Sequence, residues 1–258
     1  MSSVLIVGAT RGLGASLAKQ YAARAGAAVY GTTRSQSVPP GFPPQVKWLP
    51  GIDLMDAGVG EALVKQLGDA KPLSAVIITA GHFTTEDLTA DKGPNWEEEQ
   101  RMYTTSSIAP VFIVHRLVGA GLVHSGSRIV LVSSEAGSIA LRHAKEGGGN
   151  YAHHASKAAL NMVGKLLSLD LGDKGVVVSI VHPGFMRTDM TRGVGFDQYW
   201  DAGGAVTPDE AATSLMAWTD ELDMSKTGEY WAPRGPGDIG TAEAVLGQGL
   251  GTPLHLPW

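Results

Sequence analysis

The residues best suited to chemistry lie together in the middle of the chain, in Tyr151-Ala152-His153-His154-Ala155-Ser156-Lys157. Apolar residues follow at helical spacing, which predicts that this stretch opens a helix. Residues four apart on a helix point in nearly the same direction, so His153 and Lys157 share a face, whereas Tyr151 points about 120° away. An imidazole titrates near pH ~6.5, and a neighbouring ammonium favours its neutral form. The pattern predicts acid–base chemistry at His153; the alternative is that His153 is a polar spectator.

A glycine-rich turn near the N-terminus predicts a dinucleotide site. The turn follows the apolar run Ser3–Val7, which is typical of a strand buried in a parallel sheet, and it precedes a predicted helix over Ala15–Ala25. Glycines let the backbone approach a pyrophosphate closely, and a helix N-terminus favours its negative charge. The alternative is an ordinary glycine-rich turn. The candidate cofactor contacts here are Gly8, Thr10, Arg11, Gly12, Leu13 and Gly14.

The residues after the second predicted strand indicate which nucleotide binds. An acid there would bind the 2′-hydroxyl of an adenosine ribose, but this chain has Gly31-Thr32-Thr33-Arg34. Arg34 could hold a 2′-phosphate through two hydrogen bonds, with Arg11 as a second contact, so NADP(H) is the predicted cofactor. The alternative is that both arginines are only solvated. Asp53 follows the third predicted strand and could reach the adenine or cap the next helix.

Strand and helix patterns alternate along the chain. Further strands are predicted at Ala27–Gly31, Val46–Pro50, Ala75–Thr79, Arg128–Val132, Val176–Val181 and, last, Gly228–Ala232. Further helices are predicted at Gly60–Leu67, Tyr151–Leu171, Pro208–Leu222 and Trp96–Leu122, the last with a kink or a lost hydrogen bond at Pro110. This alternation predicts an α/β fold with a doubly wound parallel sheet, in a single domain over residues 1–258. The glycine-rich tail Gly235–Gly251 is expected to be irregular and to pack on the surface.

Composition excludes several classes of function. A length of 258 residues suits one α/β domain with a large core. The chain has no cysteine, so disulfides, thiolate catalysis and cysteine-ligated metal are excluded, and no metal is expected. The net charge of −5 gives no reason to expect nucleic acid or an anionic membrane as partner. No apolar run is long enough to span a membrane, and a strand begins at once at the N-terminus, so a cytoplasmic location is expected.

Together these motifs resemble the short-chain dehydrogenase/reductase superfamily, specifically its carbonyl-reductase-like members. The resemblance covers nearly the whole chain and rests on Gly8-x-x-x-Gly12-x-Gly14, Thr79-Ala80-Gly81, Ser133-Ser134-x-x-Gly137, Ala155-Ser156-Lys157 and His182-Pro183-Gly184-x-x-x-Thr188. It implies a Rossmann-type domain that binds NAD(P) and forms a homodimer or homotetramer. It also implies that Ser134 polarises a substrate carbonyl, Lys157 holds the nicotinamide ribose, and Thr188 contacts the carboxamide. Further implied cofactor contacts are Ala80, Gly81 and Pro183.

Two positions depart from the family pattern. The family's Tyr-x-x-x-Lys reads His153-x-x-x-Lys157 here, and the helical Asn that supports its proton relay aligns with Ser106. The distal imidazole nitrogen ends about 2 Å short of a phenol oxygen, and a misplacement of about 1 Å can cost on the order of a hundredfold in rate. His153 would therefore need a bridging water or a deeper substrate. Ser106 is most simply a core or backbone-bonded serine, and Glu135 a solvated loop acid.

The segment after Thr188 covers the substrate in this family, which predicts a lid around residues 189–207. Its Phe196, Tyr199 and Trp200 favour a small, largely apolar ligand; the alternative is that they pack the lid onto the core. The leading hypothesis is an NADP(H)-dependent oxidoreductase of secondary metabolism that reduces a carbonyl or an imine by hydride transfer. Its alternatives are a non-redox enzyme on the same fold (an isomerase, dehydratase or cyclisation catalyst) and a non-catalytic nucleotide sensor. The predicted catalytic residues are Ser134, His153 and Lys157.

Overall fold

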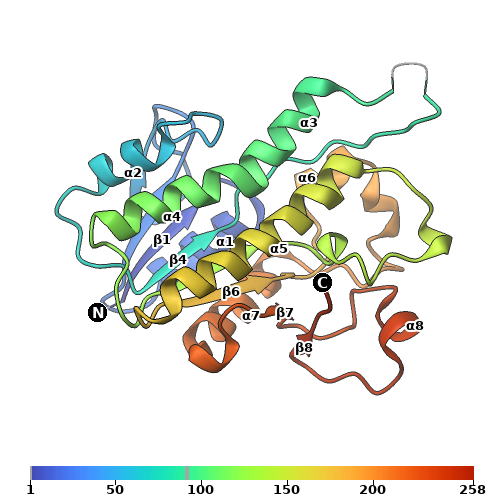
Figure 1. The fold of residues 1–258 in the computed structure, drawn as a ribbon. Coiled ribbons are helices and arrows are strands. Elements are labelled where there is room, and N and C mark those ends of the chain that lie inside the picture. The colour runs from blue at the N-terminus through green and yellow to red at the C-terminus, as the bar shows by residue number, and fades with distance from the viewer. Residues whose placement is uncertain (1, 91–92) are drawn as a thin grey trace.

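A computed structural model of the chain describes residues 2–90 and 93–258. Within these residues the centre of the fold is an eight-stranded sheet in the order β3-β2-β1-β4-β5-β6-β7-β8 (Figure 1). The strands are β1 Ser3–Val7, β2 Ala28–Thr32, β3 Val46–Leu49, β4 Ala75–Ile78, β5 Arg128–Val132, β6 Val177–Val181, β7 Tyr230–Ala232 and β8 Leu254–His255. Strands β1 to β7 pair in parallel, and β8 pairs antiparallel with β7. The predicted Rossmann-type α/β fold is confirmed.

Helices cover both faces of the sheet (Figure 1). They are α1 Gly12–Ala22, α2 Val59–Leu67, α3 Trp96–Tyr103, α4 Ala109–Gly119, α5 Tyr151–Gly172, α6 Asp189–Gly193, α7 Pro208–Glu221 and α8 Ala242–Leu246. Helices α2, α4 and α5 pack on one face and α1 and α7 on the other. The chain reverses its winding between β1 and β4, which opens a crevice at the carboxyl ends of these strands.

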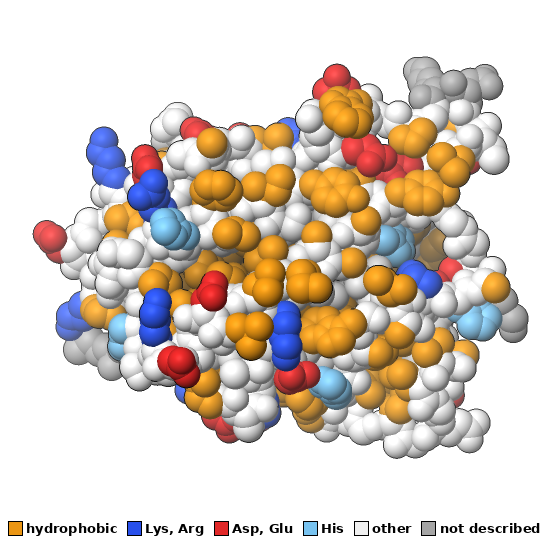
Figure 2. Space-filling model, viewed as in Figure 1, with side chains coloured by type: hydrophobic (Ala, Val, Ile, Leu, Met, Phe, Trp, Pro, Cys, Tyr) orange, Lys and Arg blue, Asp and Glu red, His pale blue; other side chains and the backbone are white. Residues whose placement is uncertain are grey.

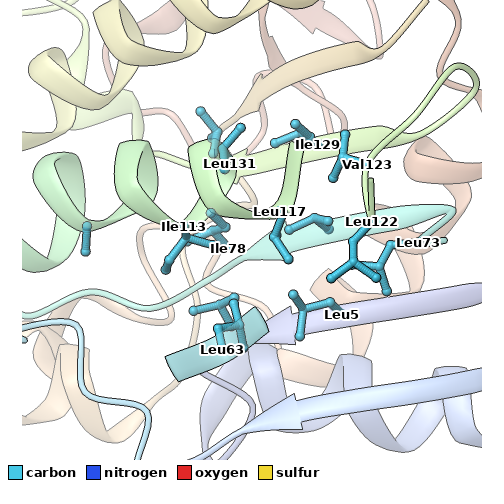
Figure 3. Close-up of a cluster of buried hydrophobic side chains, with 14 of the residues drawn as sticks. Leu5, Leu63, Leu73, Ile78, Ile113, Leu117, Leu122, Val123, Ile129 and Leu131 are labelled. Atoms are coloured by element: carbon cyan, nitrogen blue, oxygen red, sulfur yellow. The ribbon is translucent and has the colours of Figure 1, made fainter. Parts of the chain in front are cut away.

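The continuous apolar runs of the strands follow from this double covering. On β1, Leu5 and Val7 face the cluster under α2, α4 and α5, whereas Val4 and Ile6 face the cluster under α1 and α7. Figure 3 shows the first cluster, in which Leu5 lies among side chains from α2, α4 and neighbouring strands. Alternate strand residues point to opposite faces, so a strand buried on both faces is apolar throughout.

The predicted single helix over Trp96–Leu122 is wrong in one respect. A π-helical turn, Thr104–Ile108, separates α3 from α4, and Pro110 lies in the first turn of α4. Proline has no N–H to donate to the preceding turn, and a wider turn accommodates its ring. Thr105 Oγ1 and Ser107 Oγ each donate to the carbonyl oxygen four residues back, at 2.8 and 2.9 Å. These bonds satisfy carbonyls in a turn where the regular ladder is interrupted.

Three further predictions about the chain need correction. Helix α1 begins at Gly12, inside the glycine turn, rather than at Ala15. Strand β7 is not the last strand, because β8 follows it. The tail Gly235–Gly251 is not wholly irregular: it contains α8, and Ile239 and Ala242 are buried with Tyr230 and Leu254 in a third apolar cluster. A two-residue strand and a five-residue helix are too short to produce a readable period.

Candidate functional site

A single cavity of about 1480 Å³ lies at the carboxyl ends of the strands. Every residue that the sequence singled out as a catalytic or cofactor candidate lines it: Gly8, Thr10, Arg11, Gly12, Leu13, Gly14, Arg34, Asp53, Ala80, Gly81, Ser134, His153, Lys157, Pro183 and Thr188. The cavity thus joins the glycine turn to the start of α5. Ser106, the aligned relay position, is not among the lining residues.

The glycine turn brings bare backbone to the cavity wall. Gly8 has φ +91°, and a Cβ there would lie 2.9 Å from Ala80. A Cβ on Gly14 would lie 2.1 Å from the carbonyl oxygen of Gly8, so neither position has room for a side chain. Thr79 Oγ1 donates to the Val7 and Gly8 carbonyls at 3.0 and 3.1 Å and holds the turn in place. This turn before the first helical N–H groups fits a pyrophosphate.

Two cations in the cavity wall beside the glycine turn and the end of β2 have no partner among the described residues. Arg11 and Arg34 are exposed, and among the described residues neither side chain makes a hydrogen bond or an ion pair. Their guanidinium groups are available to a phosphate. Asp53 Oδ1 accepts the Met55 N–H at 3.0 Å, which closes a local turn, and α2 begins only at Val59. The helix-capping alternative for Asp53 is therefore wrong.

Lys157 is the buried cation of the site. It is 8% exposed, and its Nζ donates to the Val132 carbonyl at 2.9 Å. Burial lowers the pKa of Lys157 to about 8. A Cβ on Gly81 would lie 3.7 Å from Nζ and 4.0 Å from the Ser106 Oγ, so all three lie close together. Ser106 is 1% exposed and its hydroxyl has no hydrogen-bond partner, which confirms the core serine and excludes the backbone-bonded one.

His153 lies in an apolar and cationic environment. Its ring stacks on Phe83 with centroids 3.9 Å apart, and the His154 ring packs edge-on at 5.5 Å. Nδ1 is buried without a partner, which leaves Nε2 as the nitrogen that can face the cavity. Burial above all, and then the charges of Lys157, His154 and Arg142, lower the pKa of His153 to about 3. The ring is neutral at physiological pH and can donate a hydrogen bond but not act as an imidazolium acid.

The neighbouring polar groups are held by specific contacts. Ser134 Oγ accepts the Ala136 N–H at 3.2 Å and keeps its own hydrogen available to a ligand. Glu135 is not the expected solvated acid: its side chain is 27% exposed and forms an ion pair with Arg142. His154 Nδ1 lies 2.8 Å from the Asn150 carbonyl oxygen, so Nδ1 carries a proton and donates it to that oxygen.

The segment after β6 forms one wall of the cavity. Thr188 caps α6, with its Oγ1 accepting the Thr191 N–H at 3.2 Å. The Phe196 ring meets Phe83 edge-on at 5.6 Å, and Tyr199 follows at 6.1 Å. Phe196 and Tyr199 line the cavity, whereas Trp200 does not. Tyr199 is exposed and Phe196 and Trp200 are half-buried, and none of the three belongs to an apolar core cluster, so the structure favours the cavity wall over core packing for Phe196 and Tyr199.

Three residues that line the cavity, Phe83, Arg142 and Asp238, belong to none of the sequence motifs. Phe83 follows the Thr79-Ala80-Gly81 motif closely, and its position could have suggested a wall residue. Arg142 and Asp238 line the cavity through folding alone. His182 opens the His182-Pro183-Gly184 motif, but no role was expected for its side chain. Among the described residues no group of histidine and acidic side chains is arranged to hold a metal ion, and no helix is both long and apolar enough to cross a membrane.

Comparison with known proteins identifies the family. The family model described as short chain dehydrogenase matches residues 2–198. The chain belongs to the short-chain dehydrogenase family. Relatives of this short-chain dehydrogenase include the 1-hydroxy-2-glutathionyl-2-methyl-3-butene dehydrogenase of Rhodococcus sp. strain AD45, 27% identical over 231 residues, 89% of this chain and 96% of that protein. Another is the 3-oxoacyl-acyl-carrier-protein reductase of Escherichia coli, 29% identical over 75% of this chain and 77% of that protein.

Solved structures share the fold of this short-chain dehydrogenase. A carbonyl reductase from chicken fatty liver, solved with NADPH bound, aligns with a TM-score of 0.71 and 24% identity over 90% of this chain and 96% of that one. A carbonyl reductase from Pseudomonas aeruginosa aligns over the full length of both chains, with a TM-score of 0.73 and 23% identity. At these identities the likeness establishes the fold. Family membership makes the protein an oxidoreductase.

Proposed function

We propose that the protein is an NADP(H)-dependent oxidoreductase that reduces a carbonyl or an imine of a small, largely apolar metabolite. One observation carries the proposal: a single cavity joins two unpaired arginines and a glycine turn to Ser134, His153 and Lys157. The likeness to a carbonyl reductase solved with NADPH supports the same cofactor.

The residues that would hold the cofactor lie in two parts of the cavity. The glycine turn would take the pyrophosphate, Arg11 and Arg34 the 2′-phosphate, and Asp53 the adenine. At the other end Lys157 would hold the nicotinamide ribose, and the remaining contacts would come from Ala80, Gly81, Pro183 and Thr188. When bound, a reduced nicotinamide supplies the hydride that such a reaction requires.

The side chains near Lys157 would have separate roles in the reaction. The Ser134 hydroxyl and the neutral His153 ring donate hydrogen bonds to the substrate oxygen, where negative charge develops as the carbon receives hydride. The new alkoxide must also gain a proton. Because the pKa of His153 is about 3 and that of Lys157 about 8, we assign the proton to the Lys157 ammonium and the orienting hydrogen bond to His153. A protonated imine carries its own proton, so its reduction needs no proton donor.

Aromatic side chains suggest the shape of the substrate. Phe83, Phe196 and Tyr199 form a continuous series of edge-on contacts along the wall beside His153. We propose that residues 189–207 act as a lid over a planar, apolar ligand held against this wall. The Arg142–Glu135 pair would border the ligand at its polar end.

Absorbance of NADPH tests the proposal directly. The purified protein is mixed with NADPH and a panel of ketones, aldehydes and cyclic imines, and the loss of absorbance is followed. Turnover with absorbance loss that disappears in Ser134→Ala and Lys157→Met supports the proposal. No affinity for either NADPH or NADH would overturn it.

A second candidate is favoured by the low pKa of His153, because the site then lacks a titratable acid in the position usual for carbonyl reduction. It is a non-redox reaction on the same fold, an isomerisation, dehydration or cyclisation, that keeps the nucleotide pocket. Product formation without any change in NADPH absorbance would favour it. NADPH binding without turnover of any compound would favour a nucleotide sensor instead.

We also propose that the protein works in the cytoplasm, in secondary metabolism, and that it forms a homo-oligomer. The surface of the structure supports the homo-oligomer. Apolar side chains lie exposed along α4 and α5 (Figure 2). They are Val111 and Phe112 on α4, with Ile108 just before it, and Met162, Leu166 and Leu169 on α5. A patch of this kind on a monomer is a common sign of a protein interface. A second copy would cover it across a twofold axis.

A further inference from the structure

His182 connects the end of β6 to the turn that carries Ser134. It is 4% exposed, and its Nδ1 accepts the Glu135 N–H at 3.1 Å. A nitrogen that accepts a hydrogen bond carries no proton, so the proton of the neutral ring is on Nε2. The histidine therefore has one defined tautomer, with Nε2–H directed away from Glu135.

The group that faces Nε2 is a buried carboxylate from the C-terminal segment. The Asp238 side chain is 4% exposed, and its Oδ1 lies 3.8 Å from His182 Nε2, which is longer than a hydrogen bond. Among the described residues neither atom has a hydrogen-bond partner, so the carboxylate acts on Nε2–H through its charge. Its Oδ2 accepts the Phe185 N–H at 2.9 Å and lies 3.7 Å from Arg234 Nε. Although burial acts to raise the pKa of Asp238, interactions with His182, Phe185 and Arg234 lower it overall, so the group is ionised.

These contacts join the two turns on either side of the reacting end of the cavity. One is the Ser134–Glu135 turn, which Tyr230 also holds by donating its hydroxyl to the Ser134 carbonyl. The other is the turn through Gly184, which has φ +111°. A Cβ on Gly184 would lie 2.6 Å from Asp238 Oδ2, so the carboxylate lies directly against the backbone.

We propose that Asp238 is a positioning residue, whose charge favours the Nε2–H tautomer of His182 and so stabilises the Glu135 N–H bond to Nδ1 that joins the Ser134 turn to the Pro183–Phe185 turn. The inference about geometry stands on these contacts, and its effect on rate rests on the proposed function. At metal sites, groups that orient a ligand are typically worth about 10- to 100-fold in activity, and we expect a similar factor for this orienting contact.

Asp238→Asn is the sharpest test. An asparagine has no negative charge to favour a proton on Nε2, and when its oxygen accepts the Phe185 N–H, its amide N–H groups oppose Nε2–H. We expect the substitution to shift His182 toward the Nδ1–H tautomer, in which it can no longer accept from Glu135. Long-range ¹H–¹⁵N NMR of the ligand-free protein reads the tautomer and the Glu135 amide shift without any turnover.

Kinetics provide the second measurement. With a substrate found in the panel, Asp238→Asn should lower kcat about 10- to 100-fold while the Kd for NADPH changes by less than about threefold. His182→Asn should lower kcat by a similar factor. The kcat of the double variant should be no lower than that of the less active single variant, because both substitutions disrupt the same link between Asp238, His182 and Glu135. Glu243→Gln, an exposed acid in the same C-terminal segment, is the control and should match the wild type.

The outcomes separate this inference from the proposed function. An Nδ1–H tautomer of His182 in the wild type, or additive effects of the two substitutions on kcat, would overturn the positioning role. If Asp238→Asn does not fold, the wild-type spectrum and His182→Asn still decide. An Nε2–H tautomer that Asp238→Asn shifts, in a protein that turns over no substrate, would support the positioning role and count against the proposed reductase.

Discussion

The ring of His153 stacks on the ring of Phe83, with centroids 3.9 Å apart and planes inclined by 25°. Phe83 belongs to the segment after β4, whereas His153 lies in the first turn of α5. The contact therefore joins two elements that are distant in sequence, and it removes water from one face of the imidazole. Burial of this kind disfavours the charged ring and is the main reason that the pKa of His153 falls to about 3.

A neutral His153 predicts acid sensitivity of the fold. The pKa is about 6.5 in an unfolded chain and about 3 in the folded one, so between these values only the unfolded chain binds the proton. The free energy of unfolding therefore falls as pH falls through this window, by about 3 kcal/mol at pH 4.5. His153→Phe keeps a ring against Phe83 and cannot titrate, so it should lose about 3 kcal/mol less than the wild type between pH 7 and 4.5.

Urea unfolding at pH 7, 6, 5 and 4.5 measures this difference. His124→Gln removes an exposed histidine and should retain the pH dependence of the wild type. Parallel curves for the wild type and His153→Phe would show that His153 titrates normally in the folded protein.

The sequence predicted the fold because its strands are buried on both faces. Continuous apolar runs such as Ser3–Val7, each followed by a helix-length segment, leave few arrangements other than a parallel sheet. The sequence could not predict elements that are too short or too irregular to show a helix or strand period in their apolar residues. Strand β8 has two residues, and the π-helical turn of Thr104–Ile108 departs from the helical period by a single residue per turn.

The site likewise contains residues that sequence motifs could place and residues that they could not. Local motifs and the family resemblance were sufficient to place the glycine turn, Ser134 and Lys157 on one cavity, because the first two follow strand ends and Lys157 lies near the start of α5. The stacking of Phe83 on His153 depends on how two distant elements pack, and no spacing encodes it. Asp238 follows a glycine-rich stretch with no motif of its own, and only tertiary structure brings it to His182.

His153→Tyr should increase carbonyl reduction at least tenfold. A phenol oxygen reaches about 2 Å further along the same direction than the distal imidazole nitrogen. The Lys157 ammonium would favour the phenolate and so make the phenol a better acid near neutral pH. The measurement is kcat/KM for the best ketone of the panel, from NADPH absorbance. His154→Tyr, one residue further along the helix, is the matched control, and an equal gain there would count against the specific role of position 153.

The lowered pKa of Lys157 predicts how the dissociation constant of NADPH depends on pH. Its folded pKa is about 8, so the ammonium is present at pH 7 and largely lost by pH 9.5. The dissociation constant for NADPH should therefore rise with pH, through a step near pH 8 in the ligand-free protein. Lys157→Met should bind weakly at every pH, without the step. Lys165→Met, which removes a partly exposed lysine of the same helix, should keep it, and a step that survives in Lys157→Met would assign it to another group.

The apolar surface of α4 and α5 predicts a subunit interface. Leu169 is 67% exposed and Phe112 47% exposed, and a charge placed at either would be buried in the proposed oligomer. Leu169→Glu should shift the sedimentation coefficient from that of a dimer or tetramer to that of a monomer. Met224→Glu places the same charge at an exposed apolar residue elsewhere and should leave the assembly intact. An oligomer that is unaffected by Leu169→Glu and Phe112→Glu would have its interface on another face.

Arg34 predicts the choice between NADPH and NADH. Its side chain lines the cavity after β2, is exposed and is unpaired among the described residues, and no acid stands at the end of β2 to receive a ribose hydroxyl. A charge-assisted hydrogen bond to a phosphate is worth about 1.5–3 kcal/mol, or about 10- to 100-fold in affinity. Arg34→Asp should therefore weaken NADPH by at least about 100-fold and leave NADH unchanged or tighter, while Arg11→Ala should weaken NADPH about tenfold. Calorimetric titration with both nucleotides reads the ratio. Arg116→Ala, an exposed arginine paired with Glu61, controls for the loss of one positive charge. Equal losses for both nucleotides in Arg34→Asp would mean that the arginine supports the fold of the turn and does not read the 2′-phosphate.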